Sequence, residues 1–316
     1  MIKREQVRCI MRERQYKLLI WGMGTLYNRY ADMLKAAQAK NEIQIVAITA
    51  NELPDADSLD GWRVVGKESL KDEHFDYVLV MSRRYFGEIV EEIEGLGIER
   101  KKIIPGRIMD ISHFQWNSYM EILESNVSII CNNCWGGILY HTLGLECRSP
   151  FKNLFVDAEE LLHILPDLKQ YLSVTPKLSG WETDPHSGQR YPVMSIMNAA
   201  IHFNHDTNVD EALAKWKIRC EKVNYANIFV SIYTESDRVV EKFLRLSEYQ
   251  NKVCFIPRQA GNAKWSNHEN ILELDLLPGQ KEFWEAVNSS VSGDKNCQQF
   301  DILSMLHLKK VYRKIA

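Results

Sequence analysis

The sequence predicts an α/β protein, with a Rossmann-like parallel-sheet domain followed by a second α/β domain that contains a mixed sheet. Short apolar runs rich in β-branched residues alternate with amphipathic stretches along most of the 316 residues. This alternation indicates parallel strands joined by right-handed helical crossovers. A glycine-containing turn follows the first apolar run, as in nucleotide-binding units. We place the domain boundary near residue 112, so that residues 1–112 and 113–316 form the two domains.

Composition restricts the class of protein. Hydrophobic residues make up 45% of the chain and charged residues 26%, which is typical of a folded globular protein. The net charge of −3 argues against nucleic acid as a partner, because duplex binding needs a concentrated basic face. The amino terminus lacks the apolar core of a leader peptide, and no run approaches the roughly 20 apolar residues of a membrane helix. We therefore expect a cytoplasmic protein with reduced cysteines and no membrane insertion, and self-association as a homo-oligomer is left open.

The elements expected in the first domain alternate between strand and helix. Strands are expected at residues 16–21, 43–48, 62–65, 75–81 and 103–104. Helices are expected at residues 27–39 and 86–96. The segment GLGIERKKIIPG near the end of this domain resembles the amino-terminal domains found beside sugar-modifying enzymes.

The turn GMGT after the first strand is a candidate nucleotide site. Small residues let backbone amides approach a phosphate at a helix start, so Gly22, Gly24 and Thr25 are candidate cofactor-binding residues for a nucleotide or nucleotide sugar. Two departures from the motif oppose this interpretation. Tyr27 occupies the third glycine position and would obstruct helix packing or the pyrophosphate, and residues 49–52 place no acid cleanly at the strand tip for a ribose. The alternative is a vestigial domain that uses its glycines only for the turn.

The second domain follows a helix or linker at residues 110–124. Its expected strands are residues 127–130, 154–156, 191–203 as one or two strands, 227–233, 253–256 and 271–276. Its expected helices are the segment after the first strand, residues 158–172 with an interruption at Pro166, 209–223 and 237–246, and a mixed tail at 283–315. A turn-rich segment at residues 176–190 has the length of a functional lid or binding loop.

Residues 126–156 concentrate polar and small residues where a strand meets a helix. The strand runs into CNNCWGG, and Gly144 stops the helix that follows. Open α/β sheets bind ligands at such junctions. Amide groups and an indole face suit a sugar, so the candidate substrate-binding residues are Asn132, Asn133, Trp135 and Asn153. The alternative is that the asparagines cap the helix and the tryptophan fills a gap in the core.

Cys134 is the candidate nucleophile, because the dipole at a helix amino terminus lowers the pKa of a thiol. His202 and His205 follow a strand of the same domain and are the candidate catalytic bases, with Asp206 or Asp184 as the orienting acid. The alternative for Cys134 is a small buried thiol that packs under the turn.

Two other cysteine chemistries fit the spacing less well. Cys131 and Cys134 stand in a strand–CxxC–helix order, but Cys131 is expected to face the core, and the proline and glycine of a thioredoxin-like motif are missing. A zinc site would need His141 and Cys147, whose spacing matches no usual zinc motif. We therefore assign no residue to a metal.

The strings NNCWGG at 132–137, LGL at 143–145 and SPFKNLF at 149–155 resemble the signature of a bacterial family. Its members are labelled as exopolysaccharide-biosynthesis proteins or as domains of unknown function. The resemblance covers about residues 126–256 and implies a role in cell-surface glycan biosynthesis, without a settled activity. We therefore expect a protein of exopolysaccharide or capsule assembly that acts as a transferase on a sugar or activated sugar. The alternative is a non-catalytic nucleotide-sugar-binding or scaffold protein.

Overall fold

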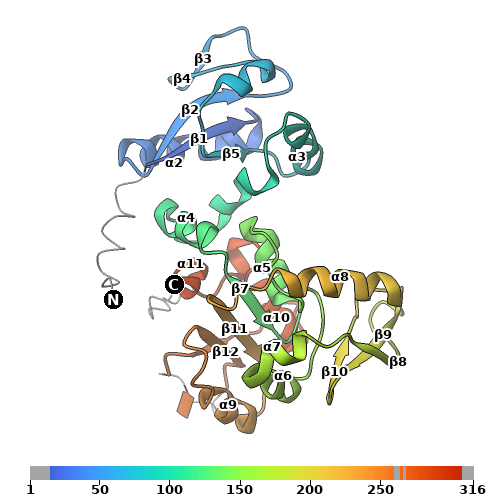
Figure 1. Ribbon diagram of the computed structural model, residues 1–316. Helices are drawn as coiled ribbons and strands as arrows, with labels where there is room; N and C mark the ends of the chain where they lie inside the picture. Colours follow the sequence, from blue (N-terminus) through green and yellow to red (C-terminus); the bar gives the residue numbers. More distant parts are fainter. Residues whose placement is uncertain (1–14, 260–263, 266–267, 308–316) are drawn as a thin grey trace, which may run out of the picture. The chain divides into compact units, whose positions relative to one another are not determined.

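The chain falls into two compact units (Figure 1). The computed structural model describes residues 15–259, 264–265 and 268–307. Unit 1 contains residues 1–110 and 114–117, and unit 2 contains residues 111–113 and 118–316. Both units have a parallel sheet with helices, and unit 2 also has an antiparallel sheet. The mixed α/β class predicted from the sequence is confirmed, and in unit 2 the parallel and antiparallel strands lie in separate sheets.

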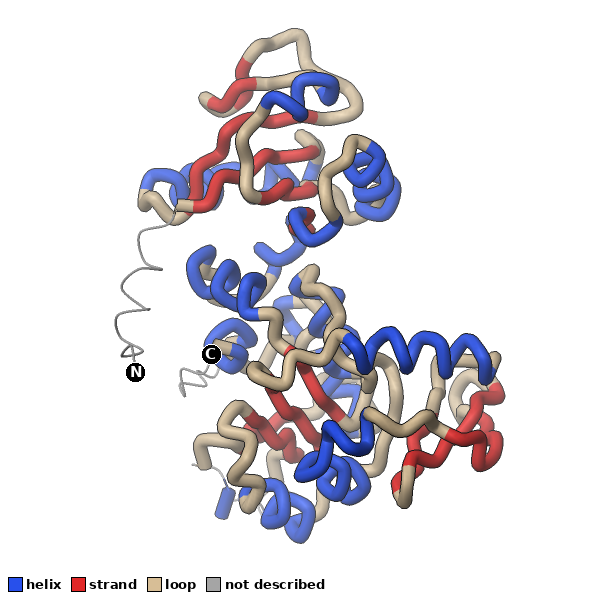
Figure 2. The backbone as a smooth tube through the Cα atoms, in the orientation of Figure 1, coloured by secondary structure: helices blue, strands red, loops and turns tan. Residues whose placement is uncertain are grey.

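Unit 1 is built on a parallel sheet with the strand order β2-β1-β5-β6 (Figure 2). The strands of this sheet are β1 Tyr16–Trp21, β2 Ile43–Thr49, β5 Tyr77–Val80 and β6 Ile103–Pro105. The helices of the unit are α2 Thr25–Ala39 and α3 Phe86–Gly95, with 3-10 turns at η1 Lys67–Asp72, η2 Arg100–Lys102 and η3 Gly106–Asp110. The short strands β3 Ser58–Leu59 and β4 Trp62–Arg63 pair in an antiparallel ribbon. Because β2 and β5 flank β1, the strand order reverses direction there, and ligands of open α/β sheets bind at such a point.

Unit 2 is built on a second parallel sheet, with the strand order β13-β12-β11-β7. The strands of this sheet are β7 Ser128–Cys131, β11 Ile228–Tyr233, β12 Lys252–Pro257 and β13 Ile271–Leu274. The helices are α4 Trp116–Ser125, α5 Trp135–Leu143, α6 Ala158–Ile164, α7 Leu168–Leu172, α8 Val209–Glu221, α9 Asp237–Leu244, α10 Phe283–Ser289 and α11 Ile302–Leu306. Two 3-10 turns join them, η4 Leu165–Asp167 and η6 Lys295–Cys297. The end of the predicted helical tail, residues 308–315, lies outside the described residues.

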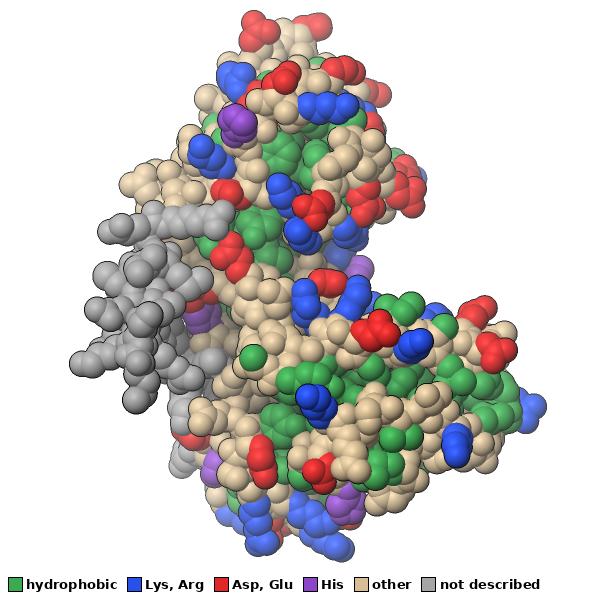
Figure 3. All heavy atoms as spheres, in the orientation of Figure 1, with side chains coloured by type: hydrophobic (Ala, Val, Ile, Leu, Met, Phe, Trp, Pro, Cys, Tyr) green, Lys and Arg blue, Asp and Glu red, His purple; other side chains and the backbone are tan. Residues whose placement is uncertain are grey.

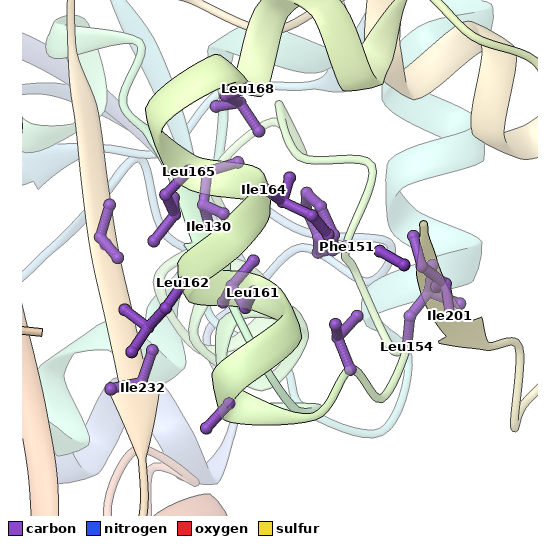
Figure 4. Packing of buried hydrophobic residues seen from close by; sticks show 14 of the residues in the cluster. Ile130, Phe151, Leu154, Leu161, Leu162, Ile164, Leu165, Leu168, Ile201 and Ile232 are labelled. Atoms are coloured by element: carbon purple, nitrogen blue, oxygen red, sulfur yellow. The ribbon is translucent and has the colours of Figure 1, made fainter. Parts of the chain in front are cut away.

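Both faces of the unit 2 parallel sheet are buried, which explains why its strands read as continuous apolar runs. On one face, Ile130 and Ile232 belong to a hydrophobic cluster that also contains the apolar side of α6. Figure 4 shows Leu162 and Leu165 directed toward these two strand residues. On the other face, the indole of Trp135 packs against aromatic rings from β11 and β12.

The antiparallel sheet of unit 2 corrects the prediction of a long loop at residues 176–190. The strands of this sheet are β8 Lys177–Thr183, β9 Arg190–Ile196 and β10 Ala199–His202, in the order β10-β9-β8. Most of the expected loop is therefore β8, and the turn is confined to residues 184–189. The side chains of β8 are nearly all exposed, so the sequence shows no alternation of apolar and polar residues that would predict a strand. The extended conformation of β8 comes from its pairing with β9.

Residues 154–156 do not form a strand, contrary to the prediction from their apolar run. Phe155 makes a single antiparallel bridge with His202 at the end of β10. The run is apolar because Leu154 and Val156 are buried in the cluster that Figure 4 shows, and an irregular segment can bury side chains without a ladder.

Candidate functional site

The candidate site of unit 2 is built where β7 ends and α5 begins. A side-chain hydrogen bond stabilises the turn between them. Oδ1 of Asn133 accepts from the backbone N–H of Trp135, the first residue of α5, at 3.1 Å. The helix ends at Gly144, whose φ of 66° is a left-handed conformation that favours glycine. Cys134 is therefore placed at the N-cap of α5, beyond the carboxyl end of a parallel strand.

The thiol of Cys134 meets the imidazole of His205. Sγ of Cys134 lies 3.2 Å from Nε2 of His205, within hydrogen-bond reach. Cys134 is half-buried and His205 is exposed, so the pair is open to solvent on the imidazole side. The structure thus brings together two of the three residues that the sequence suggested for catalysis.

Backbone hydrogen bonds carry His205 to this position. The N–H of Val156 donates to the carbonyl of Asn132 at 3.1 Å, which ties the segment after the SPFKNLF string to the cysteine-containing turn. Phe155 and His202 then exchange two backbone hydrogen bonds, at 3.0 and 2.8 Å, which tie the same segment to the end of β10. His205 follows three residues later. The bridge at Phe155 therefore connects the nucleophile turn with the histidine-bearing strand.

Burial raises the pKa of the Cys134 thiol above its ordinary value, and a hydrogen bond from the side chain of Asn204 acts in the opposite direction. The sequence had suggested a lowered pKa from the helix amino terminus. That expectation is wrong, because desolvation of the thiolate is the larger effect here. Cys134 therefore rests as a protonated thiol, and its activation needs a base.

Two residues of this site were missed by sequence reasoning. Asn204 hydrogen-bonds to the Cys134 thiol, although only its position beside His205 in the chain could have suggested it. Tyr233 ends β11, the neighbour of β7, and its pKa is raised by burial first and then by the Cys134 charge. The rule that ligands bind at the carboxyl ends of adjacent parallel strands would have found Tyr233.

The four residues suggested for sugar binding have other tasks. The Asn132 amide is engaged at both ends, because Oδ1 accepts from the N–H of Tyr233 and Nδ2 donates to its carbonyl, at 3.0 and 3.3 Å. Asn132 thereby extends the pairing of β7 with β11. Trp135 is 0% exposed and packs against the rings of Phe229 and Phe255. Its indole face is thus part of the core, which corrects the suggestion that it stacks on a sugar.

Asn133 and Asn153 also support the helix start. Asn133 is buried and directly precedes the N-cap Cys134, and its Oδ1 accepts from the N–H of Trp135, so its side chain orders the turn before α5. Asn153 has a φ of 57° and places Oδ1 only 1.9 Å from where a Cβ on Gly137 would be. The second glycine of the string is therefore required by the close approach of Asn153. Asn153 is half-buried, and of the four residues it is the one that keeps a partly exposed side chain.

The remaining catalytic suggestions are placed elsewhere. Nδ1 of His202 lies 3.2 Å from a carboxylate oxygen of Glu182, and its ring contacts Phe155 and Tyr191. Asp206 is buried and accepts a hydrogen bond from Nζ of Lys215 at 2.7 Å, whereas Asp184 accepts hydrogen bonds inside the β8–β9 turn. These contacts assign His202, Asp206 and Asp184 to other networks.

Cys131 takes the core position expected for it. It is buried, and its Sγ would lie 2.6 Å from a Cβ added at Gly136, so the thiol packs under the first turn of α5. Burial raises its pKa to about 12. Within the residues that the structure describes, no group of three or more His, Cys, Asp and Glu side chains could hold a metal ion. The same described residues contain no helix of the length and apolarity that a membrane crossing requires.

The turn residues of unit 1 border a separate cavity. Gly22, Gly24 and Thr25 line a cavity of about 990 Å³ at the carboxyl end of β1. Tyr27 was expected to obstruct it, but Tyr27 is buried and its hydroxyl donates to Asp60 at 2.6 Å, away from the lining residues. On the face of the molecule in Figure 3, acidic and basic side chains are interspersed over both units.

Comparison with known proteins divides the chain near residue 105, a few residues before the boundary between its two units. Residues 14–104 match the model of a C2185-like, N-terminal domain. A protein of Haemophilus influenzae described as uncharacterized is 30% identical over 138 residues, which are 43% of this chain and 64% of that protein. The chain thus spans less than two thirds of this relative's length. Residues 106–307 match the model of a domain of unknown function, DUF1919, and because that match covers more than half of the sequence, the chain belongs to the DUF1919 family.

Proposed function

We propose that this protein is a group transferase of exopolysaccharide or capsule assembly, with Cys134 as the nucleophile and His205 as its base. The observation that carries the proposal is the 3.2 Å distance between Sγ of Cys134 and Nε2 of His205, beyond the end of a parallel strand. A nucleophile with a base in hydrogen-bond reach is the arrangement that covalent catalysis requires. The resemblance of the surrounding strings to proteins of surface-glycan synthesis supports a sugar or activated sugar as substrate.

Because the pKa of Cys134 is raised, the proposed reaction must begin with transfer of the thiol proton to His205. At rest the thiol is protonated, and the proposed step requires the tautomer of His205 in which Nε2 accepts from the S–H. As Sγ attacks the carbon of the transferred group, an S–C bond forms, the bond to the leaving group breaks, and the thiol proton moves to Nε2. His205 then gives this proton to the leaving group. Asn204 stabilises the charge that develops on sulfur.

The second half of the reaction returns the site to its starting state. An acceptor hydroxyl oxygen attacks the same carbon, and Nε2 of His205 takes the hydroxyl proton. The S–C bond breaks, the electron pair returns to Sγ, and the proton passes from Nε2 to the thiolate. The exposed position of His205 suits this step, because the acceptor must reach the base from solvent.

A cytoplasmic location fits the same chemistry. The cysteines in the described part of the chain are all free, as expected where thiols are kept reduced. A thiol nucleophile needs such a compartment, because oxidation would consume it.

The test is capture of the covalent intermediate. The full chain is incubated with a panel of nucleotide sugars, and separately with acyl-coenzyme A donors and a free sugar acceptor, and is then digested and mapped by mass spectrometry. We expect an adduct on the peptide that contains Cys134, formed in wild type and absent in Cys134→Ala. His205→Ala should slow transfer by about 10²–10⁴-fold, the usual contribution of a general base.

Matched variants make the result specific. Cys147→Ala removes another partly buried free cysteine of unit 2 and should leave transfer unchanged. His202→Ala removes the other candidate base and should likewise leave the Cys134 adduct in place. Transfer that persists in Cys134→Ala, or the absence of an adduct with every donor, would contradict the proposed role of Cys134.

A further inference from the structure

The cavity of unit 1 has the size and position of a ligand site. Its volume of about 990 Å³ lies at the upper end of the roughly 300–1,000 Å³ usual for small-molecule pockets. Three of its lining segments lie at the carboxyl ends of strands: residues 21–26 at β1, 50–52 after β2 and 81–85 after β5. Helices complete the lining with Arg29 of α2 and Glu88, Ile89 and Glu92 of α3. The cavity therefore lies where the strand order of the sheet reverses direction.

The start of α2 leaves its first backbone amides open to an anion. Gly24 is the N-cap and supplies no capping hydrogen bond, and the first turn of this 15-residue helix has no acidic side chain. A Cβ added at Gly24 would have no heavy atom within 4 Å, so the backbone borders open space. Gly22 shapes the turn with a φ of 110°, and its N–H donates to the carbonyl of Thr49 at 2.8 Å. A helix start of this kind binds phosphate when further cations are near.

Arginines supply those cations. Arg29 of α2 and Arg83 and Arg84 after β5 all line the cavity. Two of them are anchored by the buried carboxylate of Asp110: Arg83 forms an ion pair and a hydrogen bond with it, and Nη1 of Arg29 lies 3.7 Å from it. The hydroxyl of Tyr30 also donates to Asp110.

The anchored arginines keep donors for a second anion. Each guanidinium has five N–H groups, and Asp110 is contacted through one terminal nitrogen of each arginine. Their side chains remain more than half exposed, at 58% for Arg29 and 54% for Arg83. Asp110 therefore positions two guanidinium groups at the cavity, where they can hold a diphosphate bidentately.

The opposite side of the cavity offers acceptors for hydroxyl groups. Asn51 and Glu52 follow β2, across β1 from the arginines that follow β5. The Oδ1 of Asn51 accepts a hydrogen bond from Nε1 of Trp21 at 3.3 Å, which holds this segment against the first strand. The carboxylate of Glu52 lies three residues after the end of β2 at Thr49, and it lines the cavity as an acidic group for ribose hydroxyls.

We propose that unit 1 binds a nucleoside diphosphate, with its phosphates on the Gly22–Thr25 turn, Arg29 and Arg83, and its ribose on the Asn51–Glu52 side. The site is separate from the Cys134–His205 pair. If unit 1 binds no nucleoside diphosphate, the proposed transfer chemistry at Cys134 is unaffected. If Cys134 carries out no transfer, the proposed nucleotide site is likewise unaffected.

Isothermal titration of the full chain tests the proposal with UDP, GDP and ADP, their nucleosides, and inorganic pyrophosphate. We expect saturable binding of at least one nucleoside diphosphate, with weaker binding of its nucleoside and of pyrophosphate. Arg29→Met and Arg83→Met should each weaken binding by about tenfold to a hundredfold, the effect of losing a charge-assisted hydrogen bond. Arg63→Met is the matched control, because Arg63 pairs with Glu73 and does not line the cavity.

A second variant separates binding from folding. Gly24→Asp gives α2 an N-cap carboxylate that occupies the open amides and repels phosphate. We expect it to abolish binding while the melting temperature stays equal or rises. No binding of any nucleoside diphosphate, equal affinity for pyrophosphate and the nucleotide, or undiminished binding by both Arg29→Met and Gly24→Asp would overturn the proposal.

Discussion

Nε2 of His205 lies 3.2 Å from Sγ of Cys134, although 71 residues separate the two in the chain. The contact depends on the irregular segment around Phe155, which hydrogen-bonds to the turn before α5 on one side and to the end of β10 on the other. The short segment around Phe155 therefore both packs in the core and fixes the distance between Cys134 and His205. Changes that break the backbone hydrogen bonds of this segment are expected to alter the geometry of the pair.

Gly137 should not tolerate a side chain. In Gly137→Ala the new Cβ would lie 1.9 Å from Oδ1 of Asn153, so Asn153 must move. We expect a loss of about 1–3 kcal/mol in the free energy of unfolding, as for other overpacked sites. Urea denaturation followed by circular dichroism measures it.

A second substitution, at Asn153, tests whether the clash with Asn153 causes the loss of stability in Gly137→Ala. Gly137→Ala combined with Asn153→Gly removes the clash, and glycine accepts the φ of 57° at residue 153, so part of the loss should be recovered. Gly180→Ala is the control in the same unit, because its Cβ would have no heavy atom within 4 Å, and its effect should stay within about 0.5 kcal/mol. A double variant less stable than Gly137→Ala would show that the clash is not the cause.

Trp135 should behave as a core residue. Trp135→Ala removes a fully buried indole that packs against Phe229 and Phe255, and we expect it to cost about 3–5 kcal/mol in stability. Trp181→Ala, at an indole that is 37% exposed, should cost far less. Thermal melts of both variants decide the point, and a Trp135→Ala variant as stable as Trp181→Ala would contradict the packing described above.

Lys252 is a buried cation that completes the end of α9. Its Nζ donates to the carbonyls of Phe243, Leu244 and Leu246. Lys252→Met leaves these acceptors without their donor, and we expect a loss of about 1–3 kcal/mol. Lys242→Met, which breaks a partly exposed ion pair with Glu159, should cost less than about 1 kcal/mol. Equal losses in the two variants would contradict the capping role.

The stability that Lys252 confers should depend on pH. Burial lowers its pKa in the folded protein below the ordinary value of 10.5. Between the folded and unfolded pKa values the unfolded chain binds more protons, so folding becomes more favourable as pH rises through this window. The stability of wild type relative to Lys252→Met should therefore increase with pH up to about 10.5. Denaturation series at several alkaline pH values measure the difference, and a decrease would reverse the assigned direction of the shift.

Asn204 should set the acidity of the nucleophile. Its hydrogen bond lowers the pKa of Cys134 against the larger effect of burial, so Asn204→Ala should raise that pKa further. The pH dependence of Cys134 alkylation by iodoacetamide, followed by peptide mass spectrometry, should shift to higher pH in the variant. Asn208→Ala is a useful comparison, because Asn208 caps α8, and it should leave the profile unchanged. A shift to lower pH in Asn204→Ala would show that the amide does not stabilise the thiolate.

Much of the fold could be read from local pattern, because most strands are buried and most helices are amphipathic. The interruption of the helix at Pro166 follows directly from backbone chemistry, because proline lacks the N–H that a continuing helix needs. The strand β8 could not be read, since an exposed strand held by its neighbour carries no hydrophobic signal. The bridge at Phe155 depends on pairing with a residue 47 positions away, which a local pattern does not encode.

The candidate site was only partly predictable for related reasons. Cys134 and His205 could be named from their residue types and from the strand ends they follow. Their distance, the displacement of Trp135 into the core and the raised pKa of the thiol all depend on tertiary burial. Arg83 lies far from the glycine turn in the sequence, and it lines the same cavity as that turn only in the folded unit.

The rate of Cys134 alkylation at neutral pH, compared between wild type, His205→Ala and His202→Ala, tests the central claim most directly. Because burial keeps the thiol protonated, its reactivity should depend on proton removal by His205. We expect His205→Ala to slow alkylation at Cys134 and His202→Ala to leave it unchanged. Equal rates in wild type and His205→Ala would contradict the pairing of Cys134 with His205 as nucleophile and base.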